Sequence, residues 1–127
     1  MEASELRICN YVTDNNNDIV EIESIWGRHM VSFNTLSDKT LRTRFPTKHL
    51  NPIPLTEEWL VKFRFFEKYK STSNRWNIGG FELHDCEDDN GRLQGIFLYD
   101  FKLEVKYVHQ LQNLYFALFN KELTLGI

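Results

Sequence analysis

The spacing of apolar residues changes abruptly near Tyr107, and this change limits the folds open to the last third of the chain. Before Tyr107, apolar residues alternate with charged ones, which is typical of a strand with one buried face. After it, they recur at intervals of three and four, which predicts a helix over residues 108–119 packed on a core. A strand over residues 101–106 therefore leads directly into a helix. The buried stripe is expected to consist of Tyr107, Leu111, Leu114 and Leu118.

The first fifty residues are expected to form short strands. Segments rich in β-branched and aromatic residues predict strands over residues 6–12, 19–25, 29–33, 41–45 and 48–50. The Asn run at residues 15–17 predicts a turn, and Gly27 separates the second strand from the third. Short strands at close spacing with tight turns indicate a small SH3-like β-barrel or a curved antiparallel sheet.

The middle of the chain predicts a connector, a helix and a second set of strands. Pro52 and Pro54 lack the backbone N–H that strand pairing requires, so the segment around them is expected to be an extended connector. Thr56 then occupies the N-cap position of a helix expected over residues 57–64. Residues 75–86 predict a strand with a bulge or bend at Gly79-Gly80. The Asn90-Gly91 pair predicts a hairpin turn that leads into a strand over residues 92–99. Asn120 predicts that the last helix ends in a left-handed residue.

Taken together, these patterns predict an α+β fold. We expect one domain over residues 1–127, with a barrel-like sub-region at 5–50 and a second sub-region at 51–127. The second sub-region contains the first helix, an antiparallel β-meander and the closing C-terminal helix. A chain of this length can bury a core without disulfide or metal cross-links.

Composition and charge exclude several classes of protein. A net charge of −3 offers no overall attraction for nucleic acid or an anionic membrane, and no apolar run is long enough to span a bilayer. The polar, acidic residues 1–5 do not resemble a secretory signal. Cys9 and Cys86 are isolated, so we expect reduced thiols, no zinc site and a cytoplasmic protein without membrane contact.

Three segments carry a resemblance: residues 6–12, residues 52–60 (PIPLTEEWL) and residues 106–123, which begin KYVHQLQNLYFAL. Together they are similar to a family of short proteins common in the genomes of gut anaerobes and their prophages. That family has no assigned activity, so the resemblance implies a mobile-element protein and no particular chemistry. Its pattern has glycine where this chain has Cys9, Arg64 and Asn120. Asn120 preserves the left-handed cap, whereas Arg64 leaves the end of the first helix open.

No catalytic constellation is present in the sequence. The four histidines, His29, His49, His84 and His109, lie on separate elements without metal-ligand spacing. Acidic residues at 85–89 do not match an EF-hand and are typical of a solvated hairpin, with weak calcium binding as the alternative. His109 and Asn113 share one helix face; they either pair with backbone groups or bind a small ligand together.

The only basic stretch is near residues 39–49. Its cations can bind phosphates: Arg42, Arg44 and Lys48. The aromatic rings of Trp26 or Phe45 can stack on bases. The alternative is that these residues form a solvated face. We expect a non-enzymatic accessory protein of a mobile element or prophage that binds a macromolecule, protein or nucleic acid, without cofactor or metal. The alternatives are a small-ligand or nucleotide-binding protein that acts as an anti-defence sponge, and a hydrolase using His84 or His109. Oligomeric state is not indicated.

Overall fold

The computed structural model describes residues 1–67, 75–79, 81–87, 93–98 and 103–125, and it has an α+β fold. The chain divides into two compact units. The first comprises Met1–Pro54 and Tyr107–Glu122, and the second Leu55–Lys106 and Leu123–Ile127. The last helix thus belongs to the unit of the N-terminal half, whereas the sequence pattern groups it with residues 51–127. A single domain over residues 1–127 stays a prediction.

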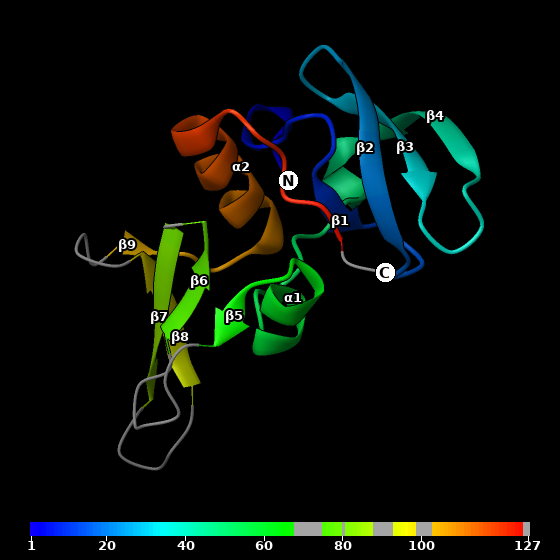
Figure 1. The fold of residues 1–127 in the computed structure, drawn as a ribbon. Helices are drawn as coiled ribbons and strands as arrows, with labels where there is room; N and C mark the ends of the chain where they lie inside the picture. Colours follow the sequence, from blue (N-terminus) through cyan, green and yellow to red (C-terminus); the bar gives the residue numbers. More distant parts are fainter. Residues whose placement is uncertain (68–74, 80, 88–92, 99–102, 126–127) are drawn as a thin grey trace. The chain divides into compact units, whose positions relative to one another are not determined.

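The first unit contains an antiparallel sheet of four strands in the order β1-β2-β3-β4 (Figure 1). They are β1 (Tyr11–Thr13), β2 (Ile19–Trp26), β3 (Met30–Thr35) and β4 (Leu41–Pro46). Within the described residues, β1 and β4 are the two edges, so the antiparallel sheet is confirmed and its closure into a barrel is not. One hydrophobic cluster forms the core of this unit: Leu6, Val12, Val20, Ile22, Val31, Phe33, Phe45 and Leu50.

Two segments predicted to be strands adopt other structure. A short 3-10 helix (Ala3–Glu5) is followed by a turn, and β1 begins only at Tyr11 because Cys9 has a left-handed backbone with φ of 75°. Residues 47–49 form a second 3-10 helix (Thr47–His49) rather than a fifth strand. The turn near residue 16 is confirmed, with Asn17 at φ of 64°, and Gly27 separates β2 from β3 as predicted.

The last helix has its predicted range but a different buried face. α2 spans Val108–Phe119, and Asn120 follows it with a left-handed φ of 54°. Leu111 is fully buried, Leu114 is half-buried and Leu118 is 57% exposed, so the predicted stripe is wrong at its C-terminal end. The buried side is instead confined to the first half of the helix and includes two polar side chains. It consists of Val108, His109, Leu111 and Gln112.

The second unit contains a short helix and an antiparallel sheet of five strands in the order β5-β6-β7-β8-β9. The helix α1 (Glu57–Lys62) is shorter than predicted, and the Thr56 hydroxyl caps it by accepting from the Trp59 N–H at 3.4 Å. The strands are β5 (Phe66–Glu67), β6 (Arg75–Ile78), β7 (Phe81–Glu87), β8 (Leu93–Leu98) and β9 (Leu103–Glu104).

The strand predicted over residues 75–86 is two strands. Ile78 pairs with Phe81, so Gly79, with φ of 53°, lies in a two-residue hairpin turn rather than at a bulge within one strand. Such turns need positive φ, which glycine adopts without strain. Gly80 and the predicted hairpin at residues 88–91 lie outside the described residues. The strands β7 and β8 that flank these residues pair antiparallel.

The backbone is left-handed at all three positions where the resemblance has glycine. Cys9, Arg64 and Asn120 have φ of 75°, 67° and 54°. At the first of them, Ile22 receives a hydrogen bond from the Cys9 N–H (2.8 Å) and donates one to the Asn10 carbonyl (2.9 Å). Two residues therefore oppose one, as in a bulge that commonly holds glycine at positive φ.

Arg64 ends the first helix in a Schellman motif. Its N–H donates to the Val61 carbonyl at 2.9 Å, and the Phe65 N–H donates to the Leu60 carbonyl at 3.0 Å. This pairing requires a left-handed residue after the helix, where glycine avoids the clash that a Cβ atom causes. The end of the first helix, left open by the sequence, is therefore resolved by the backbone at Arg64.

We expect Arg64→Gly to be more stable than Arg64→Ala by about 1 kcal/mol, because only glycine relieves the left-handed strain. Arg64→Ala is the matched control, since both variants lose the same exposed side chain. Denaturant unfolding of the two variants gives the difference directly. Equal free energies of unfolding, or a more stable alanine variant, would contradict the left-handed helix end.

Candidate functional site

The polar side of α2 is bonded to the N-terminal segment. Gln112 is fully buried; its Oε1 accepts from the Tyr11 N–H at 2.8 Å, and its Nε2 donates to the Cys9 carbonyl at 2.8 Å. These two backbone groups lie at the start of β1, an edge strand of the described sheet, on the side away from β2. Gln112 therefore satisfies a donor and an acceptor whose burial would otherwise be costly.

Two asparagines extend this contact. The Asn10 Nδ2 donates to the Asn113 Oδ1 at 2.8 Å, and the Asn113 Nδ2 donates to the Glu5 carbonyl at 3.1 Å. The Asn10 Oδ1 accepts from the Arg7 N–H at 2.8 Å. We call Asn10, Gln112 and Asn113 the α2 clamp. Because each amide uses both its donor and its acceptor, the clamp specifies one position of α2 on the N-terminal segment.

An ion pair lies beside the clamp. The Arg7 guanidinium contacts both carboxylate oxygens of Glu122, at 2.6 and 3.2 Å, and lies 4.1 Å from the centre of the Phe116 ring. Two-point pairing of arginine with a carboxylate restricts geometry more than a single contact does. The middle of α2 and the segment that follows it are thereby connected to the N-terminal segment.

His109 is thus buried in the first unit, and Asn113 is half-buried beside it. Asn113 uses its amide in the α2 clamp, and the His109 ring is 2% exposed and stacks on Tyr107 with ring centres 5.9 Å apart. Burial lowers the pKa of His109, and the nearby Glu5 carboxylate opposes this shift. The His109 Nδ1 has no hydrogen-bond partner among the described residues. A ligand shared by this pair stays a prediction, and their contacts give them a structural role.

The Cys9 thiol and the possible metal ligands were the other candidates for chemistry. Burial raises the pKa of the Cys9 thiol, and Glu122 and Glu21 raise it further, so the reactive thiolate is disfavoured. No group of three His, Cys, Asp or Glu side chains there has metal-binding geometry. The side chain of His84 and the acidic residues at 85–89 lie outside the described side chains.

A bulge separates the basic residues of β4. Val31 pairs with Phe45 and Phe33 pairs with Arg42, so β4 contains one extra residue between these pairs. In a regular strand, Arg42 and Arg44 would share a face. The extra residue instead leaves Arg42 opposite the core residue Phe33, with its guanidinium 5.0 Å from the Phe45 ring centre. Arg44, at the bulge with φ of 54°, lies on the other face.

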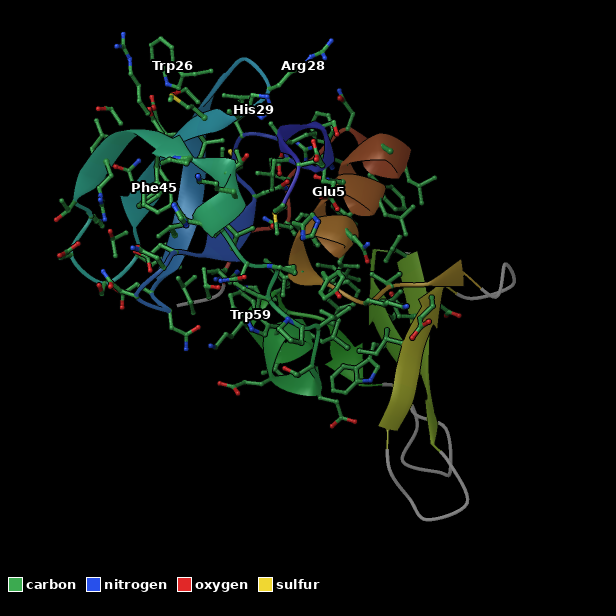
Figure 2. The ribbon with its side chains drawn as sticks, turned by 180° about the vertical axis from the view of Figure 1, so that it is seen from behind. Glu5, Trp26, Arg28, His29, Phe45 and Trp59 are labelled. Carbon is green, nitrogen blue, oxygen red and sulfur yellow. The ribbon has the colours of Figure 1, made fainter. Side chains whose placement is uncertain are left out.

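A second bulge moves Trp26 out of the core. Ile22 pairs with Phe33 and Ser24 with Ser32, so β2 has an extra residue at Glu23. Without it, Trp26 would follow Ile22 onto the buried face. Trp26 is 47% exposed and projects from the end of the hairpin, whereas Phe45 is buried (Figure 2). Both were predicted as rings that stack on bases, and only Trp26 presents a ring to solvent.

The exposed Trp26 ring is held in place from two sides. Its Nε1 donates to the hydroxyl of the buried Ser32 at 2.8 Å. The Arg44 guanidinium lies 5.3 Å from the ring centre, within the range of a cation–π contact. The Ser32 hydroxyl also accepts from the Arg44 N–H at 3.4 Å. One buried serine therefore positions both the aromatic ring and the arginine.

Three residues form a row across the outer face of the sheet. Trp26 pairs with Met30, and Met30 pairs with Pro46, so their side chains lie next to one another on adjacent strands. Beside this row is a shallow depression of about 340 Å³, lined by His29, Met30, Pro46, Thr47 and Lys48. We call Trp26, Met30, Arg44, Pro46 and Lys48 the Trp26 surface.

Charge is distributed unevenly along the first unit. Before residue 24 the chain has six acidic residues and Arg7 as its only cation. Between residues 24 and 49, Asp38 is the only acidic residue, and its Oδ1 accepts from the Thr40 N–H. The basic residues of that segment include Arg44 and Lys48 of the Trp26 surface. The five described residues that line the depression include a lysine and no Asp or Glu, although the net charge of the chain is −3.

The structure brings together some of the predicted site residues and separates others. Arg44 and Lys48 border the Trp26 surface, Arg42 lies on the opposite face, and His109 and Asn113 belong to α2. Sequence reasoning missed Ser32 and Met30. The sequence does carry a signal for the bulge that exposes Trp26, since the apolar residues of β2 change phase between Ile22 and Ile25.

Comparisons with protein-family models, with curated proteins and with solved structures found no match to this chain. In the described ranges, no helix has the length and apolar character needed to cross a bilayer.

We expect Gln112→Ala to lower the free energy of unfolding by about 2–4 kcal/mol, because it leaves the Tyr11 N–H and the Cys9 carbonyl without partners. Gln110→Ala is the control: the same residue type on an exposed position of α2 loses the bond that its Oε1 accepts from the Tyr107 N–H at 3.3 Å and should cost about 1 kcal/mol. Urea unfolding measures both. Similar losses in the two variants would show that Gln112 is not a clamp residue.

We expect stability to fall as the pH drops below about 6.5, the ordinary pKa of histidine. Below this pH, His109 takes up a proton in the unfolded chain, whereas burial lowers the pKa of His109 in the folded protein and keeps its ring neutral. Because the unfolded state binds the proton more readily, the free energy of unfolding falls as the pH falls. The slope is at most about 1.4 kcal/mol per pH unit. His109→Gln should flatten the stability profile between pH 6.5 and 5.5, and His29→Gln should not. An unchanged slope in His109→Gln would count against a buried neutral imidazole.

Proposed function

We propose that this chain is a non-enzymatic binding protein whose contact surface for a macromolecule is the Trp26 surface. The observation that carries the proposal is a half-exposed tryptophan fixed by Ser32 and flanked by Arg44. Tryptophan and arginine are the residues most often responsible for binding energy at interfaces. A ring held in one orientation loses little freedom when a partner covers it.

Several exposed apolar groups support a contact surface rather than a solvated face. Met30 is 42% exposed beside Trp26, and the depression next to it is bordered by the apolar Pro46. Large apolar groups that are clustered and rimmed by charges often mark an interaction site, whereas scattered ones need no explanation. Arg44 and Lys48 provide that rim.

The described side chains support a non-catalytic role. The rings of His29, His49 and His109 are not hydrogen-bonded to any carboxylate or hydroxyl among the described residues, so a positioned general base is missing there. The thiol of Cys9 has a raised pKa. A hydrolase would need a nucleophile and a base within hydrogen-bond reach.

We further propose that the protein acts in the cytoplasm as an accessory protein of a mobile element or prophage. The support is the resemblance of residues 6–12, 52–60 and 106–123, together with isolated cysteines. The left-handed backbone at Cys9, Arg64 and Asn120 fits a pattern with glycine at those positions.

The test compares macromolecules captured by three immobilised forms of the chain. Trp26→Ala/Arg44→Ala removes the proposed contacts, and Lys39→Ala/Leu41→Ala removes an exposed cation and an exposed apolar side chain elsewhere. Captured nucleic acid and protein are quantified separately. We expect the wild type and the control to retain the same macromolecule and the first variant to lose it. Identical capture by all three forms, with folding verified by circular dichroism, would contradict the proposal.

A further inference from the structure

We propose that the Trp26 surface binds single-stranded nucleic acid, with a base stacked on the Trp26 ring and the adjacent phosphates held by Arg44 and Lys48. This inference rests on the proposed function and specifies the chemical class of the partner. It follows from what the fixed tryptophan leaves exposed, from the charge around it and from the row of side chains next to it.

The exposed part of Trp26 can offer a partner only a stacking surface. Its one hydrogen-bond donor, Nε1, is already bonded to the Ser32 hydroxyl at 2.8 Å. What remains in contact with solvent is the carbon surface of the ring. Every nucleobase has a flat face that stacks on such a ring, and stacking of this kind tolerates any sequence.

The charges beside the ring match a phosphate backbone. The Arg44 guanidinium lies over the indole, 5.3 Å from the ring centre, so a base can stack on the opposite face of the ring while the Arg44 N–H groups bind a phosphate at its edge. Lys48 and His29 border the neighbouring depression, and among the described residues that line it there is no Asp or Glu. Arg28 borders a different depression that also includes Glu2, so we do not assign it to the site.

The row of side chains favours a single strand over a duplex. Trp26 and Met30 are paired across adjacent strands, so the ring and the depression are neighbouring apolar positions. Paired side chains have Cβ atoms about 5 Å apart, comparable with the spacing of successive nucleotides. One base can stack on Trp26 while the next enters the depression beside Met30. In a duplex, the faces of the bases are covered by their neighbours, so neither position would be used.

An acidic protein segment is the competing partner, and the surface suits it less well. Such a segment would satisfy Arg44 and Lys48, but it would have to place an aromatic or aliphatic group over an indole whose donor is already used. A nucleotide supplies the flat apolar group and the negative charge in one unit, at the separation that the surface presents.

The experiment measures binding of a fluorescein-labelled twelve-nucleotide oligothymidylate by anisotropy, with its RNA counterpart and a duplex of the same length as companions. We expect both single strands to bind more tightly than the duplex. Trp26→Leu should weaken binding about tenfold or more, because stacking on one base is lost, whereas Trp26→Phe should retain most of it. If two phosphates are held, raising the salt from 50 to 200 mM should weaken binding about sevenfold.

Matched variants distinguish this site from general attraction to cations. Arg44→Ala should weaken binding and reduce the salt dependence, and Lys39→Ala, which removes an exposed cation elsewhere, should leave both unchanged. Binding that is equal in wild type and Trp26→Leu, or stronger for the duplex, would overturn the inference. If no single strand binds but a captured protein is lost in Trp26→Ala/Arg44→Ala, the inference fails and the proposed function stands. If that capture also fails, both fail.

Discussion

Two β-bulges decide which side chains of the first sheet face solvent, and the account of the molecule depends on them. A strand alternates its side chains between two faces, so one extra residue reverses everything that follows. The extra residue at Glu23 sends Trp26 outward instead of into the core with Ile22. The extra residue in β4 separates Arg42 from Arg44, so that Arg44 lies 5.3 Å from the centre of the indole ring while Arg42 is opposite Phe33. In a sheet of regular strands, Trp26 would share the face of Ile22, and Arg42 would share the face of Arg44.

The α2 clamp holds α2 in one position against the N-terminal segment that leads into the same sheet. A backbone N–H and a carbonyl at the start of the edge strand β1 point away from β2, and the Gln112 amide satisfies both. This explains why α2 buries the polar Gln112. It also explains why α2 belongs to the first unit although residues 55–106 separate it from the sheet in sequence.

The range of α2, the capping residue Thr56 and most strands of the first sheet could be predicted from the sequence, because periodicity and caps are local signals. The face of α2 could not, since Gln112 is buried only by partners a hundred residues away. The same limit applies to the site. Arg44, Lys48 and Trp26 were predicted from their chemistry, but grouping Arg42 with them assumed a regular strand. Ser32 carries no local signal at all, because its role is to bond two residues from other strands.

The central claim is that the bulges turn Trp26 to the outer face and that Ser32 and Arg44 hold it there. Nuclear Overhauser contacts from the Trp26 indole test this most directly. The account predicts contacts from the indole N–H to the Ser32 β-protons and from the ring to the Arg44 side chain. Contacts from the ring to the side chains of Ile22 or Phe33 would place Trp26 in the core and contradict it.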